Sequence, residues 1–135
     1  MLAGDVDLKT WYKPHIEKKV LKELSKRSDT KGIIDISLFF IVVLASGYLS
    51  VVTWGTLWSI PALLLYGNIF YCKVISVQHE TNHQTYFKSR ILNKIFYNIT
   101  SLLGGFEVVR WKWSHYHHHT YTIFTHEEVY DYEAN

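Results

Sequence analysis

Two long apolar runs dominate the pattern of hydrophobic and polar positions along this chain. They cover residues 33–54 and 56–77, and each is about 22 residues long, which suffices for a helix to cross a hydrocarbon layer of roughly 30 Å. Gly55 between them predicts a tight turn. The pattern therefore predicts a two-span helical hairpin, with Asp35 in the first turn of its first helix and Lys73 reaching from the second helix toward the interface.

The segment after the hairpin has a different periodicity. Apolar residues recur at helical spacing from Ile91 to Leu103, and polar residues occupy the opposite face. This pattern is typical of a helix that lies at a membrane interface and does not form a third span. Gly104 and Gly105 are expected to end it, and another helix is expected to begin near Phe106.

The leader, residues 1–31, is basic and amphipathic. Its pattern predicts a short helix from Trp11 to Arg27, whose basic face would contact anionic membrane lipids. Basic residues precede the first apolar run and follow the second, and none lies in the turn. The positive-inside rule then predicts that both termini are cytoplasmic. A formal net charge of +2 is too small to indicate a nucleic-acid partner.

These patterns together predict an all-α, multi-pass integral membrane protein. We expect a single domain over residues 1–135, with the leader, the two spans and a cytoplasmic or interfacial region at residues 78–135 that includes a histidine-bearing helix. Aromatic residues make up 16% of the chain, as expected where rings lie among lipid head groups. Cys72 is the only cysteine, so no disulfide within the chain is possible and the residue is interpreted as apolar packing.

Six of the eight histidines fall in two clusters. His79 and His83 are four residues apart, so on a helix they project from one face. In the second cluster, His118 and His119 lie within about 60° of His115 on a helix, whereas His117 points about 200° away. The remaining two, His15 and His126, lie outside these spacings and are interpreted as surface residues, with His126 as a reserve ligand. Five imidazoles are therefore expected to converge: His79, His83, His115, His118 and His119.

Imidazole suits zinc, copper and iron, so the metal must be inferred from the number of ligands. Five ligands exceed the three or four of a zinc site, and two metals are the better interpretation. Nitrogen ligands beside a membrane favour iron that activates dioxygen against an apolar substrate.

Both clusters resemble known motifs. The run His79-Glu80-Thr81-Asn82-His83 after a second span, and the run from Trp111 to Thr122, resemble the first and second histidine boxes of the membrane fatty-acid desaturases. The tryptophan-rich lead-in and the Thr-x-Thr exit favour desaturases over related hydroxylases. The resemblance covers roughly residues 33–122.

The resemblance implies a particular chemistry. It implies two non-haem iron ions, dioxygen as co-substrate, electrons from a ferredoxin or a cytochrome, and a double bond introduced into the acyl chain of an acyl-lipid or acyl-thioester. The ligands it implies are the five histidines named above, and His117 occupies a position that the family does not require. The family has a third histidine box after further spans, which these 135 residues lack, so we expect this polypeptide to be incomplete and inactive alone. Carboxylates that could orient the ligands are Glu80, Glu107, Glu127, Glu128 and Asp131.

Three alternatives remain open from the sequence. The first is a related membrane hydroxylase or alkane monooxygenase. The second is a membrane zinc metalloprotease, because residues 79–83 also fit the H-E-x-x-H pattern, although the second cluster is then unexplained. The third is a hairpin that binds or passes metal, for which Asn68, Ser46 and Ser59 are the polar residues within the spans.

Overall fold

The computed structural model describes residues 15–121, 125–126 and 129–130, with side chains up to residue 121. Five helices are followed by a two-stranded antiparallel pairing of Thr125 with Tyr130 and of His126 with Val129. The elements are α1 (Lys18–Leu24), α2 (Asp29–Val52), α3 (Ser59–Asn82), α4 (Arg90–Gly104), α5 (Val108–Tyr121), β1 (Thr125–His126) and β2 (Val129–Tyr130). Apart from β1 and β2, the helical class expected from the sequence is confirmed.

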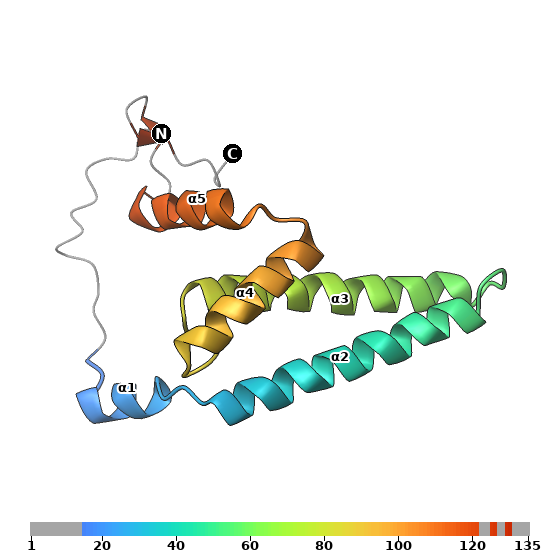
Figure 1. The fold of residues 1–135 in the computed structure, drawn as a ribbon, viewed down its shortest axis with the longest axis horizontal. Coiled ribbons are helices and arrows are strands. Elements are labelled where there is room, and N and C mark those ends of the chain that lie inside the picture. Colours follow the sequence, from blue (N-terminus) through green and yellow to red (C-terminus); the bar gives the residue numbers. More distant parts are fainter. Residues whose placement is uncertain (1–14, 122–124, 127–128, 131–135) are drawn as a thin grey trace.

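The helices α2 and α3 form an antiparallel hairpin that is the longest feature of the molecule (Figure 1). Each has 24 residues and is long and apolar enough to cross a membrane. The turn contains Gly55 at a φ of 81°, a left-handed conformation that favours glycine. The first helix begins earlier than predicted because Ser28 caps it and accepts the backbone N–H of Lys31 at 3.3 Å. The second runs five residues beyond the predicted span, so it carries His79.

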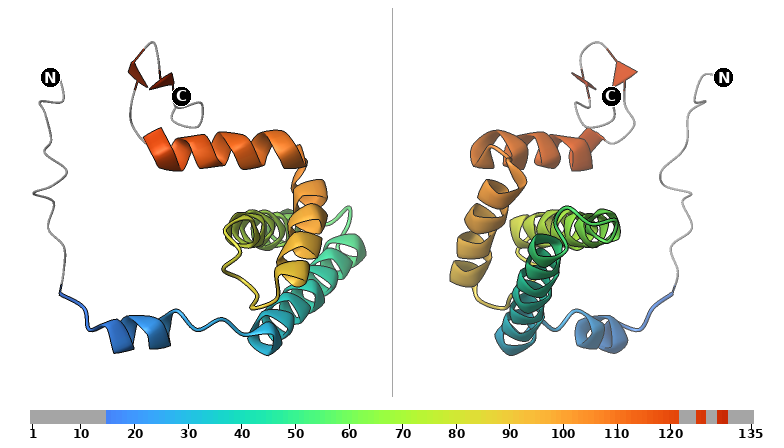
Figure 2. Two further views of the ribbon diagram at one scale, coloured as in Figure 1. Left: turned by 60° about the vertical axis from the view of Figure 1, so that its left-hand side comes forward. Right: turned by 90° about the vertical axis from the view of Figure 1, so that its right-hand side faces the viewer.

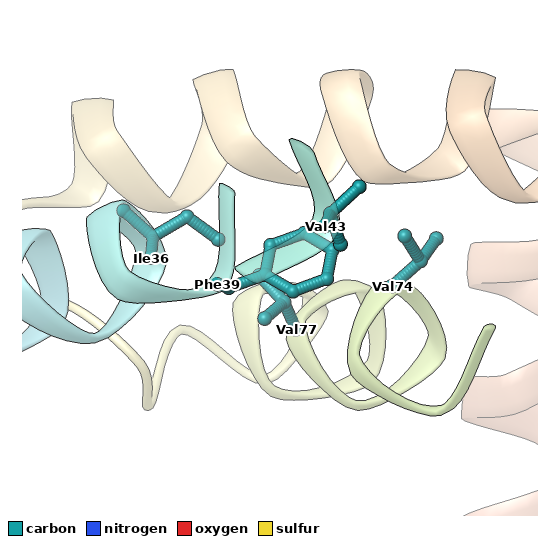
Figure 3. Close-up of a cluster of buried hydrophobic side chains, with 5 residues drawn as sticks. All are labelled: Ile36, Phe39, Val43, Val74 and Val77. Carbon is teal, nitrogen blue, oxygen red and sulfur yellow. The ribbon is translucent and has the colours of Figure 1, made fainter. Parts of the chain in front are cut away.

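The hairpin is held together along one stripe of each helix. Ile36, Phe39 and Val43 of α2 meet Val74 and Val77 of α3 in a small buried cluster (Figure 3). Most other apolar side chains of the two helices face outward. In an apolar stretch of 18 residues within each helix, only 28% of the residues of α2 and 17% of those of α3 are buried. The core helices of a soluble protein would be mostly buried, so these exposed faces fit an apolar surrounding.

Polar groups also join the two helices. Asp35 was expected in the first turn of its helix, but α2 begins at Asp29, which places Asp35 in the second turn. There its carboxylate accepts a hydrogen bond from Tyr86 and pairs with the Lys73 ammonium group at 2.5 Å. The sequence predicted only that Lys73 reaches toward the interface. It did not indicate this direct link between α2, α3 and the segment after α3.

Breaking this ion pair on one side is expected to destabilise the hairpin. Lys73→Met leaves the Asp35 carboxylate in an apolar zone, at an expected cost of about 1–2 kcal/mol, less than for a buried pair because both side chains are partly exposed. Replacing both residues, Asp35→Asn with Lys73→Met, removes both charges and should recover most of the loss. Thermal unfolding in detergent micelles measures both; a double variant that is additive in its loss would contradict a direct pairing.

The helix α4 crosses α3. The helix α5 lies beyond these two helices, on the side away from α1 (Figure 2). The face of α4 toward α3 is polar as well as buried, with Asn93, Thr100 and Ser101 almost fully enclosed. Gly105, at a φ of 72°, ends α4 as expected. The Tyr97 hydroxyl donates to the carbonyl of Val108 at 2.7 Å, which fixes the start of α5 against α4. Burial raises the pKa of Tyr97, so the hydroxyl stays a donor.

The leader helix is shorter than predicted. Only Lys18–Leu24 is helical, whereas residues 15–17 are not, and residues before 15 lie outside the part described. None of its residues is buried, and a seven-residue helix without packing gains little stability from its own hydrogen bonds.

Candidate metal centre

Four histidines from two helices meet at one end of the hairpin. The possible ligand atoms of His79, His83, His115 and His119 all lie within 4.8 Å of one another. The first two come from the carboxyl end of α3 and the residue that caps it, and the other two come from α5. The sequence spacing of four residues within each pair explains why both members face the same side of their helix.

The distances between ring nitrogens indicate a shared cation. The Nε2 atom of His115 lies 3.0 Å from Nε2 of His83 and 3.0 Å from Nε2 of His119. One ring nitrogen has one lone pair, so hydrogen bonding alone does not readily explain two such contacts. Two nitrogens bound at about 2.1 Å to one metal, at a right angle, lie about 3.0 Å apart. The donor set therefore fits a metal ion that prefers imidazole ligands.

His115 is the centre of this group and is held on two sides. Its ring is 4% exposed and stacks on Trp111, with ring centroids 4.5 Å apart and an angle of 14° between planes. Trp111 precedes it by one helical turn, and the indole also meets His79 edge-on. The sequence analysis assigned Trp111 only to the motif. The spacing of four residues between an indole and a predicted ligand was the signal that could have revealed its supporting role.

The surroundings of His83 favour the neutral imidazole that binds metal. Burial lowers the pKa of His83, and positive charge on His79 and His119 lowers it further. A neutral ring keeps a lone pair for a cation, so the lowered pKa of His83 favours metal binding by this residue.

The other two histidines of the second cluster differ from this group. His117 lies beside Tyr121, at a ring distance of 4.6 Å and away from the four, as the helical-face argument predicted. The ring of His118 stacks on His115 at 5.9 Å and lies 5.7 Å from that of His119, but it does not belong to the group of four. Its assignment as a ligand stays a prediction. His15 is exposed and lies outside the group, and the side chain of His126 lies outside the described residues.

The structure separates His118 from His119 in a way that can be tested. His119→Ala removes a member of the group and should weaken binding of the first metal ion by about 100-fold or more. His118→Ala should leave that first site within a few-fold of its original affinity and affect only a second metal ion. Titration with Co²⁺, followed by its visible absorption, measures the affinity of the first site; equal loss of this site in both variants would contradict the grouping.

The turn after His83 is tied to the amino-terminal side of α2. The Arg27 guanidinium donates to the carbonyl of Gln84 at 2.7 Å, and the Asp29 carboxylate accepts the backbone N–H of Ser89 at 2.7 Å. Thr85 closes the turn by donating its N–H and its hydroxyl to the carbonyl of Glu80, at 3.0 and 2.9 Å. These contacts span up to 60 residues, and no local sequence pattern indicates them.

The carboxylates considered as partners of the ligands have other contacts where the structure describes them. Glu80 is exposed, and its carboxylate lies 3.4 Å from the Ser76 hydroxyl, which donates to it. Glu107 accepts the backbone N–H groups of Val109 and Arg110 at the start of α5. Neither belongs to the histidine group. Glu127, Glu128 and Asp131 lie outside the described residues.

Comparison with known proteins agrees with the resemblance seen in the sequence. Residues 53–134, more than half of the chain, match the model of a family described as fatty acid desaturase. The matched region contains the second long helix and both histidine clusters. No curated protein and no solved structure matches the chain.

Proposed function

We propose that this chain, which belongs to the fatty acid desaturase family, provides histidine ligands for an iron centre that desaturates acyl chains at a membrane surface. The observation that carries the proposal is the convergence of four imidazoles from α3 and α5 at the end of an apolar hairpin. Family membership supports an oxidoreductase that acts on fatty acyl groups and supports iron as its metal, and a group of imidazoles is compatible with iron.

The proposed reaction converts a –CH2–CH2– unit of the acyl chain into –CH=CH–. Dioxygen accepts the two hydrogens, together with two electrons from a ferredoxin or cytochrome donor and two protons, and leaves as two water molecules. Iron, when bound, supplies the activation of dioxygen. The substrate is an acyl-lipid or acyl-thioester.

The residues of the chain have separate roles in this proposal. His79, His83, His115 and His119 hold one iron ion, and His118 is the candidate ligand of a second, which needs further ligands as well. Trp111 keeps the His115 ring in place and excludes water from one of its faces. The apolar faces of α2 and α3 anchor the site in the membrane, with both termini on the cytoplasmic side.

Metal analysis and product analysis test this function together. The chain is purified from membranes without chelators, and its metals are counted by mass spectrometry; iron should exceed zinc, and His79→Ala should lower it while His117→Ala leaves it unchanged. Zinc at one ion per chain without iron would sink the proposal. For product analysis, the host expresses a polypeptide that also carries the third histidine box of the family, and its lipids are analysed for new double bonds that require oxygen. Hydroxylated acyl chains in their place would identify the related hydroxylase reaction.

A further inference from the structure

A cleft between α4 and α5 carries positive charge that the proposed reaction does not use. Its volume is about 520 Å³, within the range of small-ligand sites. We call it the α4–α5 cleft. Its polar and aromatic lining includes Asn82, Arg90, Lys94, Asn98, Lys112 and Trp113.

The charge in the α4–α5 cleft is unbalanced. Three of its lining residues are cationic, none of the described lining residues is acidic, and none of the three cations forms an ion pair within the described part of the chain. Asn98 donates one amide hydrogen to the carbonyl of Lys94 at 2.7 Å, which leaves its second amide hydrogen for a ligand. Such a set of cations and an amide favours an anion with several oxygen atoms, such as a phosphate.

The position of the cations on α4 indicates where that phosphate comes from. Ile91, Ile95 and Leu102 form an exposed apolar stripe along α4, and Leu102 is 81% exposed. At about 100° per residue, Arg90, Lys94 and Asn98 form the neighbouring stripe, between these apolar residues and the face packed on α3. If the apolar stripe lies in the acyl layer, the cationic stripe lies at the depth of the phosphates.

We propose that the α4–α5 cleft binds the phosphate of a membrane phospholipid head group. Asn82 is adjacent to His83, and Lys112 is three residues before His115, so a lipid held there lies beside the histidine group. That proximity would give an acyl-lipid substrate a fixed position, and only this consequence rests on the proposed function. Binding of the phosphate itself does not require iron.

Equilibrium retention of radiolabelled dihexanoyl phosphatidylglycerol by the immobilised chain, in uncharged detergent, tests the proposal. Arg90→Gln with Lys94→Gln should lower the affinity about 25-fold, since each basic residue near a lipid phosphate contributes about fivefold. Lys112 lines the cleft from α5, and Lys112→Gln should lower the affinity about fivefold. Lys88→Gln with Arg110→Gln removes the same charge from two residues that do not line the cleft and should leave the affinity unchanged. Circular dichroism compares the folding of all variants, and Lys112→Gln keeps the test valid if the double variant unfolds.

Unlabelled competitors identify the source of the phosphate. Phosphatidylglycerol should compete, dihexanoylglycerol without phosphate should not, and inorganic phosphate and coenzyme A should compete far more weakly. Coenzyme A competing as well as phosphatidylglycerol would overturn the lipid assignment, because the cleft would then recognise the phosphates of a thioester carrier. Equal losses in the double variant of Arg90 and Lys94 and in the double variant of Lys88 and Arg110 would overturn the site, because general surface charge would explain the binding. Metal content is measured separately, so a failure of lipid binding leaves the proposed function standing. Histidine variants that lose metal should retain the lipid unchanged.

Discussion

Replacing His115 with alanine is expected to reduce metal affinity by about 100-fold or more, the largest effect of any single histidine. The Nε2 atom of His115 lies 3.0 Å from Nε2 of His83 and 3.0 Å from Nε2 of His119. It is also the most buried of the four, so water cannot easily take its place. Iron content after purification and Fe²⁺ affinity measured under anaerobic conditions should fall together.

His117→Ala is the matched control because it removes an imidazole two residues away on the same helix. Its ring lies beside Tyr121 and outside the group, so metal affinity should stay within about twofold of the original. Similar iron loss in both variants would contradict the arrangement. Trp111→Phe adds a graded test: it keeps a ring against His115 with less contact area and should weaken binding less than His115→Ala does.

The pairing of histidines within each cluster could be predicted because it follows from local geometry. Residues four apart on a helix face the same side, and this rule alone pairs His79 with His83 and His115 with His119. It also separates His117 from the others. It did not distinguish His118 from His119, because both lie within about 60° of His115 on a helix. Whether His118 or His119 joins the group depends on which side of α5 faces α3. The packing of the two helices determines that side.

The hairpin was predicted for a similar reason, whereas its polar links were not. A run of apolar residues of sufficient length predicts a span without any knowledge of its neighbours. The pairing of Asp35 with Lys73 depends on the relative shift of α2 and α3, and the contact of Arg27 with Gln84 joins residues 57 apart. Periodicity describes one helix at a time, so it carries no information about such contacts.

Asn93→Ala is expected to destabilise the chain by about 2–4 kcal/mol, because one buried side chain satisfies three backbone groups. The Asn93 Oδ1 atom accepts the N–H of Phe87 at 3.1 Å, and its Nδ2 group donates to the carbonyls of Phe87 and Ser89 at 2.8 and 2.9 Å. The segment it holds leads from His83 to α4, and the Phe87 ring within it is fully buried against Phe96. Thermal unfolding in detergent micelles should therefore shift downward, and metal affinity should fall with it.

Asn98→Ala, one turn or so further along α4, is the matched control for this prediction. The Asn98 side chain is exposed and bonds only within its own helix among the described residues, so its loss should change stability by less than about 0.5 kcal/mol. Asn93→Asp separates the accepted hydrogen bond from the two donated ones. It keeps the acceptor for the Phe87 N–H but turns an oxygen toward the carbonyl oxygens of Phe87 and Ser89. It should destabilise at least as much as Asn93→Ala. An Asp variant as stable as the original chain would show that the two donated hydrogen bonds do not hold this segment. The link from α4 to His83 would then depend on the hydrogen bond from the Phe87 N–H and on the Phe87 ring.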